Sequence, residues 1–158
     1  MWPFFLTREV TITKRLATSK EEVLAVLRPD TVLRTNPILT SVVPDVADDA
    51  AGPAGEARWY TIVEKVPLVG RLDTSTSFRC QWTDVADGVD MEVFAGAGTR
   101  LTTRLRVTPV DGGEVEYSDH VTFQGLFLLM PFIVSRAERS HGILRDIVAE
   151  KSMKSSDT

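Results

Sequence analysis

Residues 125–151, GLFLLMPFIVSRAERSHGILRDIVAEK, form the longest helical pattern in this chain of 158 residues. On a helical wheel at ~100° per residue, the apolar side chains gather on one side and the charged ones on the other. Pro131 fits near the start, because a residue in the first helical turn needs no N–H donor. The pattern therefore predicts a one-sided helix that begins near Met130. Its apolar stripe contains Met130, Ile133, Ala137, Leu144, Ile147 and Val148.

Three polar side chains interrupt or border this stripe. Ser140 lies near its centre, and Arg136 and His141 lie on its two flanks. Two interpretations of His141 stay open at this point. It is either a partly solvated residue at the boundary of the packed face, or a side chain that reaches into a cavity and hydrogen-bonds a ligand.

The start of this stretch, residues 126–134, is an apolar run interrupted by Pro131. A membrane-spanning helix needs ~20 apolar residues, so the run is too short to cross a bilayer. Either it is buried at the rim of a sheet, or it forms an exposed apolar mouth suited to hydrophobic ligands or membranes. The sequence favours burial.

Upstream of the helix, seven segments read as β-strands, most of them alternating apolar and polar residues. Residues 71–83 alternate most clearly, and turn residues at 87–88, 96–98 and 111–113 separate the later segments. Such alternation is typical of an antiparallel sheet with one face against a helix and the other in water. The predicted strands are residues 8–17, 38–46, 58–66, 71–83, 89–95, 99–110 and 114–124.

Two short helices are expected between the first and second strands. A hydroxyl residue followed three positions later by glutamate forms a capping box, and both Thr18 with Glu21 and Ser19 with Glu22 fit it. Pro29 ends this helix, and residues 29–34 form one more turn. Residues 47–56, ADDAAGPAGE, form the most loop-like stretch.

Composition restricts the classes of function. The chain is 43% apolar and 25% charged, as in an ordinary single globular domain. Its net charge of −4 and the lack of a basic patch argue against a nucleic-acid partner. The single cysteine, Cys80, excludes an internal disulfide, and with only two histidines a protein-built zinc site is not expected. We therefore expect no metal and no cofactor.

The same sequence gives a simple domain organisation. The first residues carry no convincing signal-peptide pattern, so a cytoplasmic domain without a transmembrane segment is expected, as a monomer or homodimer. The expected divisions are an N-terminal extension at residues 1–6, one domain at residues 7–152, and a tail at residues 153–158.

This order of strand, two short helices, antiparallel strands and long helix resembles the helix-grip superfamily, also labelled SRPBCC. The superfamily includes START-type lipid-transfer domains, birch-pollen-allergen-like proteins and aromatic polyketide cyclases. The resemblance covers roughly residues 7–152 and implies an α+β fold in which a curved antiparallel sheet wraps around the C-terminal helix. It also implies an internal cavity that accepts a hydrophobic small molecule. It rests on topology, so it informs fold more than function.

Three pieces also resemble a narrower family of uncharacterised fungal domains of about this length. They are VLRPDTVLRTNP, WYTIVEKVPLVGRLDTSTSFRCQWTDVADGV and AGAGTRLTTRLRV. Some members of that group are thought to belong to natural-product pathways. The resemblance carries no residue roles, because the family has no motif that maps onto single positions.

Asp119 is the most informative polar residue of the predicted inward faces, because it is in phase with Tyr117, Val121 and Phe123. Burying an unpaired carboxylate is costly. We expect Asp119 either to work with Tyr117 and His141 in acid/base chemistry on a carbonyl substrate, or simply to pair with an arginine or cap a local turn. The other candidate ligand-binding residues are Thr74, Thr76, Phe78, Trp82, Met91, Thr103, Phe123, Arg136 and Ser140.

Two functions from different classes follow from this pattern. The first is a cofactor-independent cyclase or isomerase of a polyketide- or terpenoid-like intermediate. The second is a non-catalytic carrier of a lipid or hydrophobic metabolite, with residues 47–56 or 67–70 as a mobile rim. A G-x-S-x-G elbow and a phosphate-binding glycine loop are both absent from the sequence. Cys80 is interpreted as a small core residue, and His120 as a solvent-exposed one.

Overall fold

A computed structural model describes residues 4–33, 36–45, 55–67 and 73–156. In this part of the chain, seven antiparallel strands form one sheet in the order β1-β7-β6-β5-β4-β3-β2. The helices are α1 (Lys20–Val26), α2 (Pro29–Val32) and α3 (Met130–Ser156), with a short 3-10 turn, η1 (Gly96–Gly98). The strands are β1 (Phe5–Leu16), β2 (Leu39–Pro44), β3 (Ala57–Pro67), β4 (Asp73–Val85), β5 (Gly88–Phe94), β6 (Arg100–Pro109) and β7 (Val115–Leu126).

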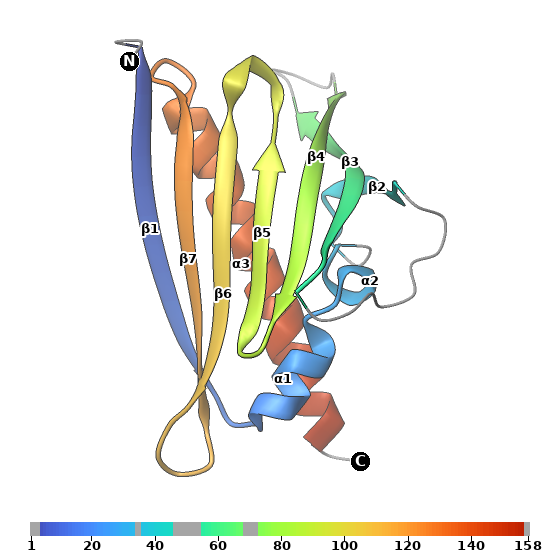
Figure 1. The fold of residues 1–158 in the computed structure, drawn as a ribbon, viewed down its shortest axis with the longest axis vertical. Coiled ribbons are helices and arrows are strands. Elements are labelled where there is room, and N and C mark those ends of the chain that lie inside the picture. Colours follow the sequence, from blue (N-terminus) through green and yellow to red (C-terminus); the bar gives the residue numbers. More distant parts are fainter. Residues whose placement is uncertain (1–3, 34–35, 46–54, 68–72, 157–158) are drawn as a thin grey trace.

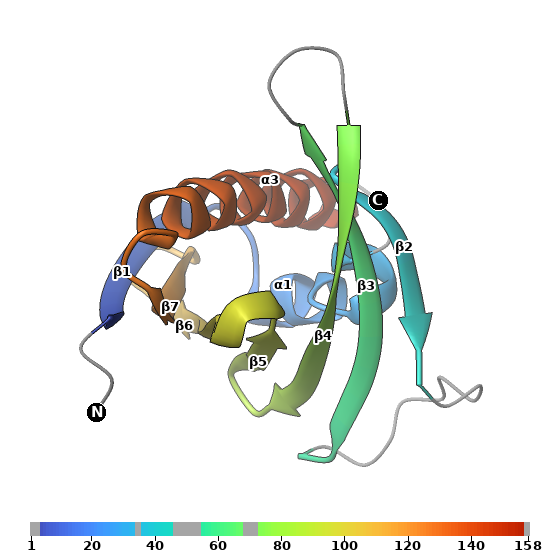
Figure 2. The same cartoon turned by 90° about the horizontal axis from the view of Figure 1, so that it is seen from above.

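The sheet curves strongly, and α3 lies across its concave side (Figures 1 and 2). In Figure 1, α1 lies near the lower end beside the C-terminal part of α3, and α2 lies higher, on the side of β2 and β3. The protein therefore has the expected α+β helix-grip architecture, with the long helix beginning at Met130 as predicted.

Alternation along the strands separates a packed face from an outer face. In β7, Val115, Tyr117, Asp119, Val121 and Phe123 are all buried, while the residues between them are only partly covered. The main core joins α1, the strands and the C-terminal half of α3, and fully buried Val23, Leu105 and Val148 belong to it. Each such aliphatic side chain contributes about 1.5–3 kcal/mol on burial.

The structure shows which of the two predicted capping boxes starts α1. Ser19 is the N-cap, its Oγ accepting from Glu22 N at 3.2 Å while Glu22 Oε2 accepts from Ser19 N at 3.0 Å. Thr18 instead is buried, and its hydroxyl is hydrogen-bonded to Oε2 of Glu22 and lies 3.4 Å from the carbonyl oxygen of Ser152. The capping box starts α1, and Pro29 opens the separate turn α2 as expected.

Several parts of the chain differ from the sequence expectation. The strand β1 begins at Phe5, inside the predicted N-terminal extension, because β7 continues to Leu126 and pairs with Phe5. His120 is only partly exposed, because Thr11 on the neighbouring β1 holds its Nδ1 at 2.7 Å. The predicted loop at 47–56 and the turn at 67–70 lie largely outside the described residues, as does the end of the C-terminal tail.

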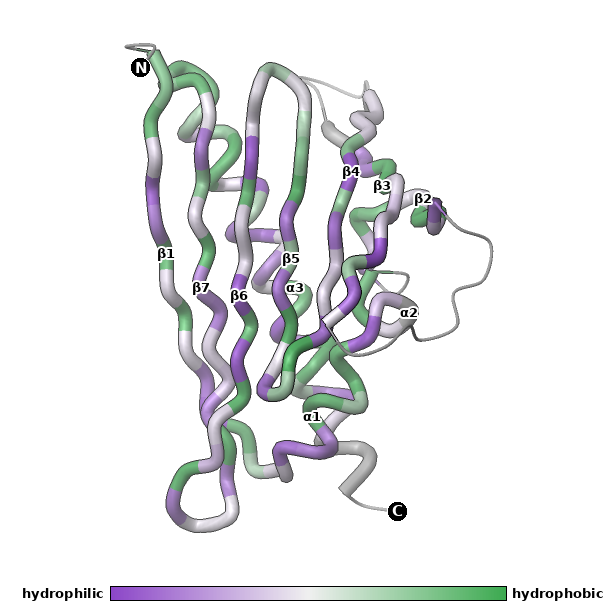
Figure 3. The backbone as a smooth tube through the Cα atoms, viewed as in Figure 1, coloured by the Kyte–Doolittle hydropathy of each residue, from purple (hydrophilic) through white to green (hydrophobic). Residues whose placement is uncertain are grey.

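The expectation that residues 126–134 are buried is wrong for five of them, the exposed Pro131 and four large apolar residues. Phe127, Leu128, Leu129 and Phe132 are 43%, 77%, 39% and 54% exposed. They lie between the end of β7 and the first turn of α3, where the Phe4 ring stacks on Phe127 with the centroids 6.3 Å apart. Figure 3 shows hydrophobic residues at this end of the molecule. Among the described residues, no helix is long and apolar enough to span a membrane.

Candidate ligand-binding site

A cavity of about 470 Å³ lies between α3 and the concave face of the sheet. Ligand sites of small molecules typically have 300–1,000 Å³ and mostly apolar walls. Cys80, Val93 and Leu101 face one another in register across β4, β5 and β6 and line the sheet side of this cavity. On the helix side, Ile133, Ala137 and Leu144 of α3 line it. The cavity is therefore mainly a hydrophobic space.

His141 brings an ionisable group to this wall. Its Nδ1 donates a hydrogen bond to Oδ2 of Asp119 at 2.6 Å, and the side chains are 12% and 0% exposed. His141 lines the cavity, whereas Asp119 lies behind it in β7. Because Asp119 occupies Nδ1, Nε2 is the ring nitrogen that remains available to a ligand. The sequence left two alternatives for Asp119: a place beside Tyr117 and His141, or a pair with an arginine or a turn cap. Its contact is with His141.

Tyr117 stands next to this pair but does not line the cavity. Burial, and to a lesser extent the nearby carboxylate of Asp119, raise the pKa of the Tyr117 phenol, against a smaller opposing effect of Arg145. Tyr117 therefore stays protonated at neutral pH. Among the described residues, neither its hydroxyl nor Oδ1 of Asp119 has a hydrogen-bond partner.

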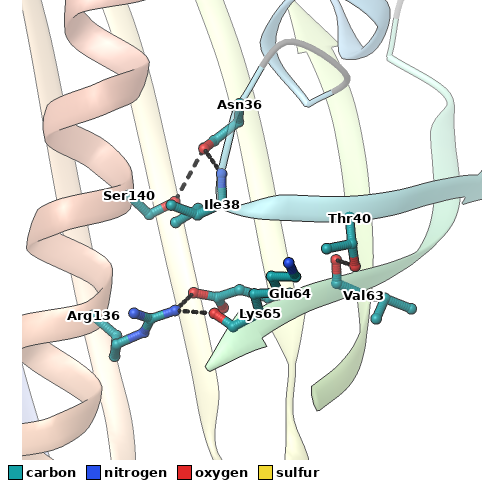
Figure 4. Close-up of polar contacts among 8 residues, drawn as sticks. All are labelled: Asn36, Ile38, Thr40, Val63, Glu64, Lys65, Arg136 and Ser140. Carbon is teal, nitrogen blue, oxygen red and sulfur yellow. Dashed lines mark hydrogen bonds and ion pairs between the residues drawn. The ribbon is translucent and has the colours of Figure 1, made fainter. Parts of the chain in front are cut away.

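A second polar part of the wall connects α3 with β3 and the segment before β2 (Figure 4). Arg136 pairs with Glu64 and also donates from Nη2 to the carbonyl oxygen of Lys65 at 2.7 Å. Asn36 donates to Oγ of Ser140 at 3.4 Å. Arg136, Glu64, Asn36 and Ser140 all line the cavity. These contacts join the helix to the sheet at the side of the cavity.

The other sequence candidates divide into two groups. Those that line the cavity are Thr76, Phe78, Met91, Thr103, Arg136 and Ser140. The side chains of Trp82 and Phe123 lie on the packed face of the sheet as well. They are 0% and 1% exposed and belong to the core rather than to the cavity wall. Thr74 is exposed and does not line the cavity, because it lies close to the β3–β4 end of the sheet.

Sequence reasoning missed Glu64 and Asn36. Glu64 follows Tyr60 and Ile62 at the strand period, and a carboxylate in phase with two buried residues was the same signal that singled out Asp119. Asn36 is buried, and its Oδ1 accepts from Ile38 N at 3.2 Å. No comparable pattern identifies Asn36, because its burial depends on its contact with α3.

Cys80 lines the cavity without being suited to nucleophilic chemistry. Burial raises the pKa of its thiol to about 12. The thiolate is the reactive form of cysteine, and it is scarce at neutral pH under these conditions. Within the described ranges, no cluster of three or more His, Cys, Asp or Glu side chains could hold a metal ion.

The comparison with protein families identifies the relationship of the chain. Residues 10–154 match the model of a family described as a domain of unknown function, DUF7053. The chain belongs to this family. The match includes the Asp119–His141 pair and every residue that lines the cavity. No curated protein matches the chain in sequence.

Solved structures resemble the chain in fold. The di-domain ARO/CYC StfQ from the steffimycin biosynthetic pathway has a TM-score of 0.72 at 11% identity, over 98% of this chain and 53% of that one. Norcoclaurine synthase from Thalictrum flavum, in complex with dopamine and hydroxybenzaldehyde, has a TM-score of 0.67 at 10% identity, over 95% and 88%. A START superfamily protein from Mycobacterium smegmatis has a TM-score of 0.64 at 13% identity, over 92% and 97%. At these identities the similarity establishes the fold alone.

Proposed function

We propose that the chain binds a hydrophobic small molecule in its cavity and acts on it as a cofactor-independent cyclase or isomerase. One observation carries this proposal. The apolar cavity has a histidine in its wall whose Nδ1 is held at 2.6 Å by a completely buried carboxylate. A buried carboxylate that orients a histidine leaves Nε2 as a directed base.

The proposed chemistry needs a base that takes up a proton and returns it, and it needs no cofactor. Nε2 of His141 takes a proton from a carbon beside a carbonyl group, which leaves an enolate. The enolate carbon then forms a bond to a second carbonyl carbon of the same molecule, and the resulting alkoxide takes the proton back from Nε2. In an isomerisation, the proton instead returns to another carbon. In both cases atoms and electrons balance without a cofactor.

Two of the fold relatives support this choice in chemical terms. One is a di-domain ARO/CYC from the steffimycin biosynthetic pathway, and another is norcoclaurine synthase in complex with dopamine and hydroxybenzaldehyde. We accordingly favour a polyketide- or terpenoid-like substrate. The fungal and natural-product setting suggested by the sequence resemblance stays a prediction, as does a cytoplasmic location.

Binding is tested by native mass spectrometry of freshly purified protein, followed by solvent extraction of any compound that dissociates. We expect a bound apolar compound of a few hundred daltons, because a cavity of about 470 Å³ holds a molecule of this size. Extraction of a polar metabolite such as a nucleotide would contradict the proposal. A measured mass equal to that of the unliganded protein would argue against a tight carrier. Turnover would then be tested separately, by the rate of proton exchange in a ketone probe.

A second candidate function, a carrier of hydrophobic molecules, is favoured by the exposed apolar rim. We define the rim as Phe127, Leu128, Leu129 and Phe132. Leu129 and Phe132 line the cavity and are 39% and 54% exposed, so the apolar surface continues from outside into the cavity. A continuous apolar path of this kind suits the transfer of a ligand from a membrane or a micelle.

For the rim, we predict that Leu128→Glu weakens binding to phosphatidylcholine vesicles by about tenfold, because a Leu side chain that is 77% exposed would otherwise enter the lipid surface. Vesicle flotation measures this effect. Val43→Glu is the matched control, since Val43 is 54% exposed but lies on β2. Equal effects of both substitutions, or no vesicle binding by the wild type, would remove the support for the carrier.

A further inference from the structure

The cavity wall carries charges at a second place besides the Asp119–His141 pair. Glu64 of β3 and Arg136 of α3 form an ion pair, and their side chains are only 14% and 16% exposed. Thr76 lies opposite Glu64 in the β3–β4 register and lines the same cavity. We call Glu64, Arg136 and Thr76 the polar pole.

The ion pair is incompletely satisfied. Both hydrogen bonds that Arg136 makes, to Glu64 and to the carbonyl of Lys65, come from Nη2. Nε of Arg136 is buried and has no partner among the described residues. A buried ion pair usually needs further hydrogen bonds to compensate for lost hydration. An ion pair that served only to hold α3 against β3 would not need to line a cavity.

The chemistry of the polar pole favours one kind of ligand group. Its carboxylate accepts hydrogen bonds, its guanidinium donates them, and the two charges compensate each other. A hydroxyl group both donates and accepts, so it can bind Glu64 and Arg136 together. A ligand carboxylate would meet the charge of Glu64, and a hydrocarbon would cover both groups without any hydrogen bond.

The polar pole is separated from His141 along α3. The separation of five positions between Arg136 and His141 corresponds to about 7.5 Å along the helix axis, and the two side chains leave the helix on flanks ~140° apart. Both nevertheless line one cavity. A ligand that touches both must therefore be elongated, with polar groups at separate positions on an apolar body.

We propose that Glu64 and Arg136 bind a neutral hydroxyl group of the ligand while its reacting carbonyl lies at His141. This inference rests on the proposed function and narrows its substrate class to hydroxylated apolar molecules, such as phenolic or alcohol-bearing ring ketones. Arg136 and Glu64 then determine specificity and take no part in proton transfer.

The test compares three probes with the same tricyclic body: fluorene, 9-hydroxyfluorene and fluorene-9-carboxylate. Titration calorimetry gives Kd for each with the wild type and with the double variant Glu64→Gln/Arg136→Met. The preference is the Kd of fluorene divided by that of 9-hydroxyfluorene. We expect the double variant to lower this preference about tenfold and to leave the Kd of fluorene within about twofold. The wild type should bind the carboxylate more weakly than the alcohol.

Two further variants keep the result interpretable. Glu92→Gln/Arg100→Met removes an ion pair between β5 and β6 outside the cavity and should leave the preference unchanged. Glu64→Gln alone, which is isosteric, should lower the preference for the alcohol even if the double variant does not fold. If the preference for the alcohol is unchanged in Glu64→Gln and in the folded double variant, the proposed hydroxyl site is wrong, while ligand binding in the cavity is not contradicted. Failure of the wild type to bind any of the three probes would overturn ligand binding itself, and the specificity proposal with it.

Discussion

Replacement of His141 by alanine is expected to slow enzyme-catalysed proton exchange by 10²–10⁴-fold, the usual contribution of a general base. The probe is 2-tetralone, a ketone with acidic protons beside its carbonyl. The rate at which deuterium replaces these protons in D₂O is measured by proton NMR, after subtraction of the buffer rate. The reason for the loss is that no other histidine lines the cavity.

Two companion variants distinguish catalysis from a general loss of structure. Asp119→Asn is expected to lower the maximal exchange rate with little change in KM, because Asp119 positions His141 without lining the cavity. His120→Ala should retain the wild-type rate, since His120 bonds Thr11 across β1 and β7 and does not line the cavity. A wild-type rate in His141→Ala would show that His141 is not the base. An absence of exchange above the buffer rate in the wild type would instead favour the carrier.

A tryptophan at Val93 is expected to weaken binding of 9-hydroxyfluorene between about tenfold and a hundredfold. Val93 lies on β5 between Cys80 and Leu101, and all three line the cavity. An indole ring at this place occupies the space of one ring of the probe, whose burial contributes about 1.5–3 kcal/mol. Titration calorimetry under the conditions of the fluorene series measures the loss.

The matched control is Thr102→Trp, which introduces the same ring on the other face of the sheet. Thr102 pairs with Glu92 and Thr122 and does not line the cavity. The thermal midpoint of each variant shows whether it still folds. If Val93→Trp folds and binds the probe as tightly as Thr102→Trp does, the ligand site lies elsewhere than in this cavity.

Much of the fold follows from local sequence patterns. The period of two along residues 114–124 and the period of 3.6 after Met130 reflect one buried face in each element, and a buried face must be apolar whatever partner covers it. Capping and proline chemistry likewise act within a few residues, so Ser19 and Pro29 mark the short helices correctly. Asp119 was identifiable for the same reason, as a charge in phase with apolar neighbours.

The sequence by itself determined the helix-grip class, the inward face of most strands, and the candidacy of Asp119 and His141. Only the tertiary structure decided which inward residues meet empty space and which meet other side chains. Trp82 and Thr103 are equally in phase, yet only Thr103 lines the cavity. Tertiary structure also brought Glu64 to Arg136 and left Leu128 exposed. The physical reason is that periodicity encodes the direction of a side chain relative to its own element, whereas a cavity, an ion pair and an uncovered rim depend on how far distant elements approach one another.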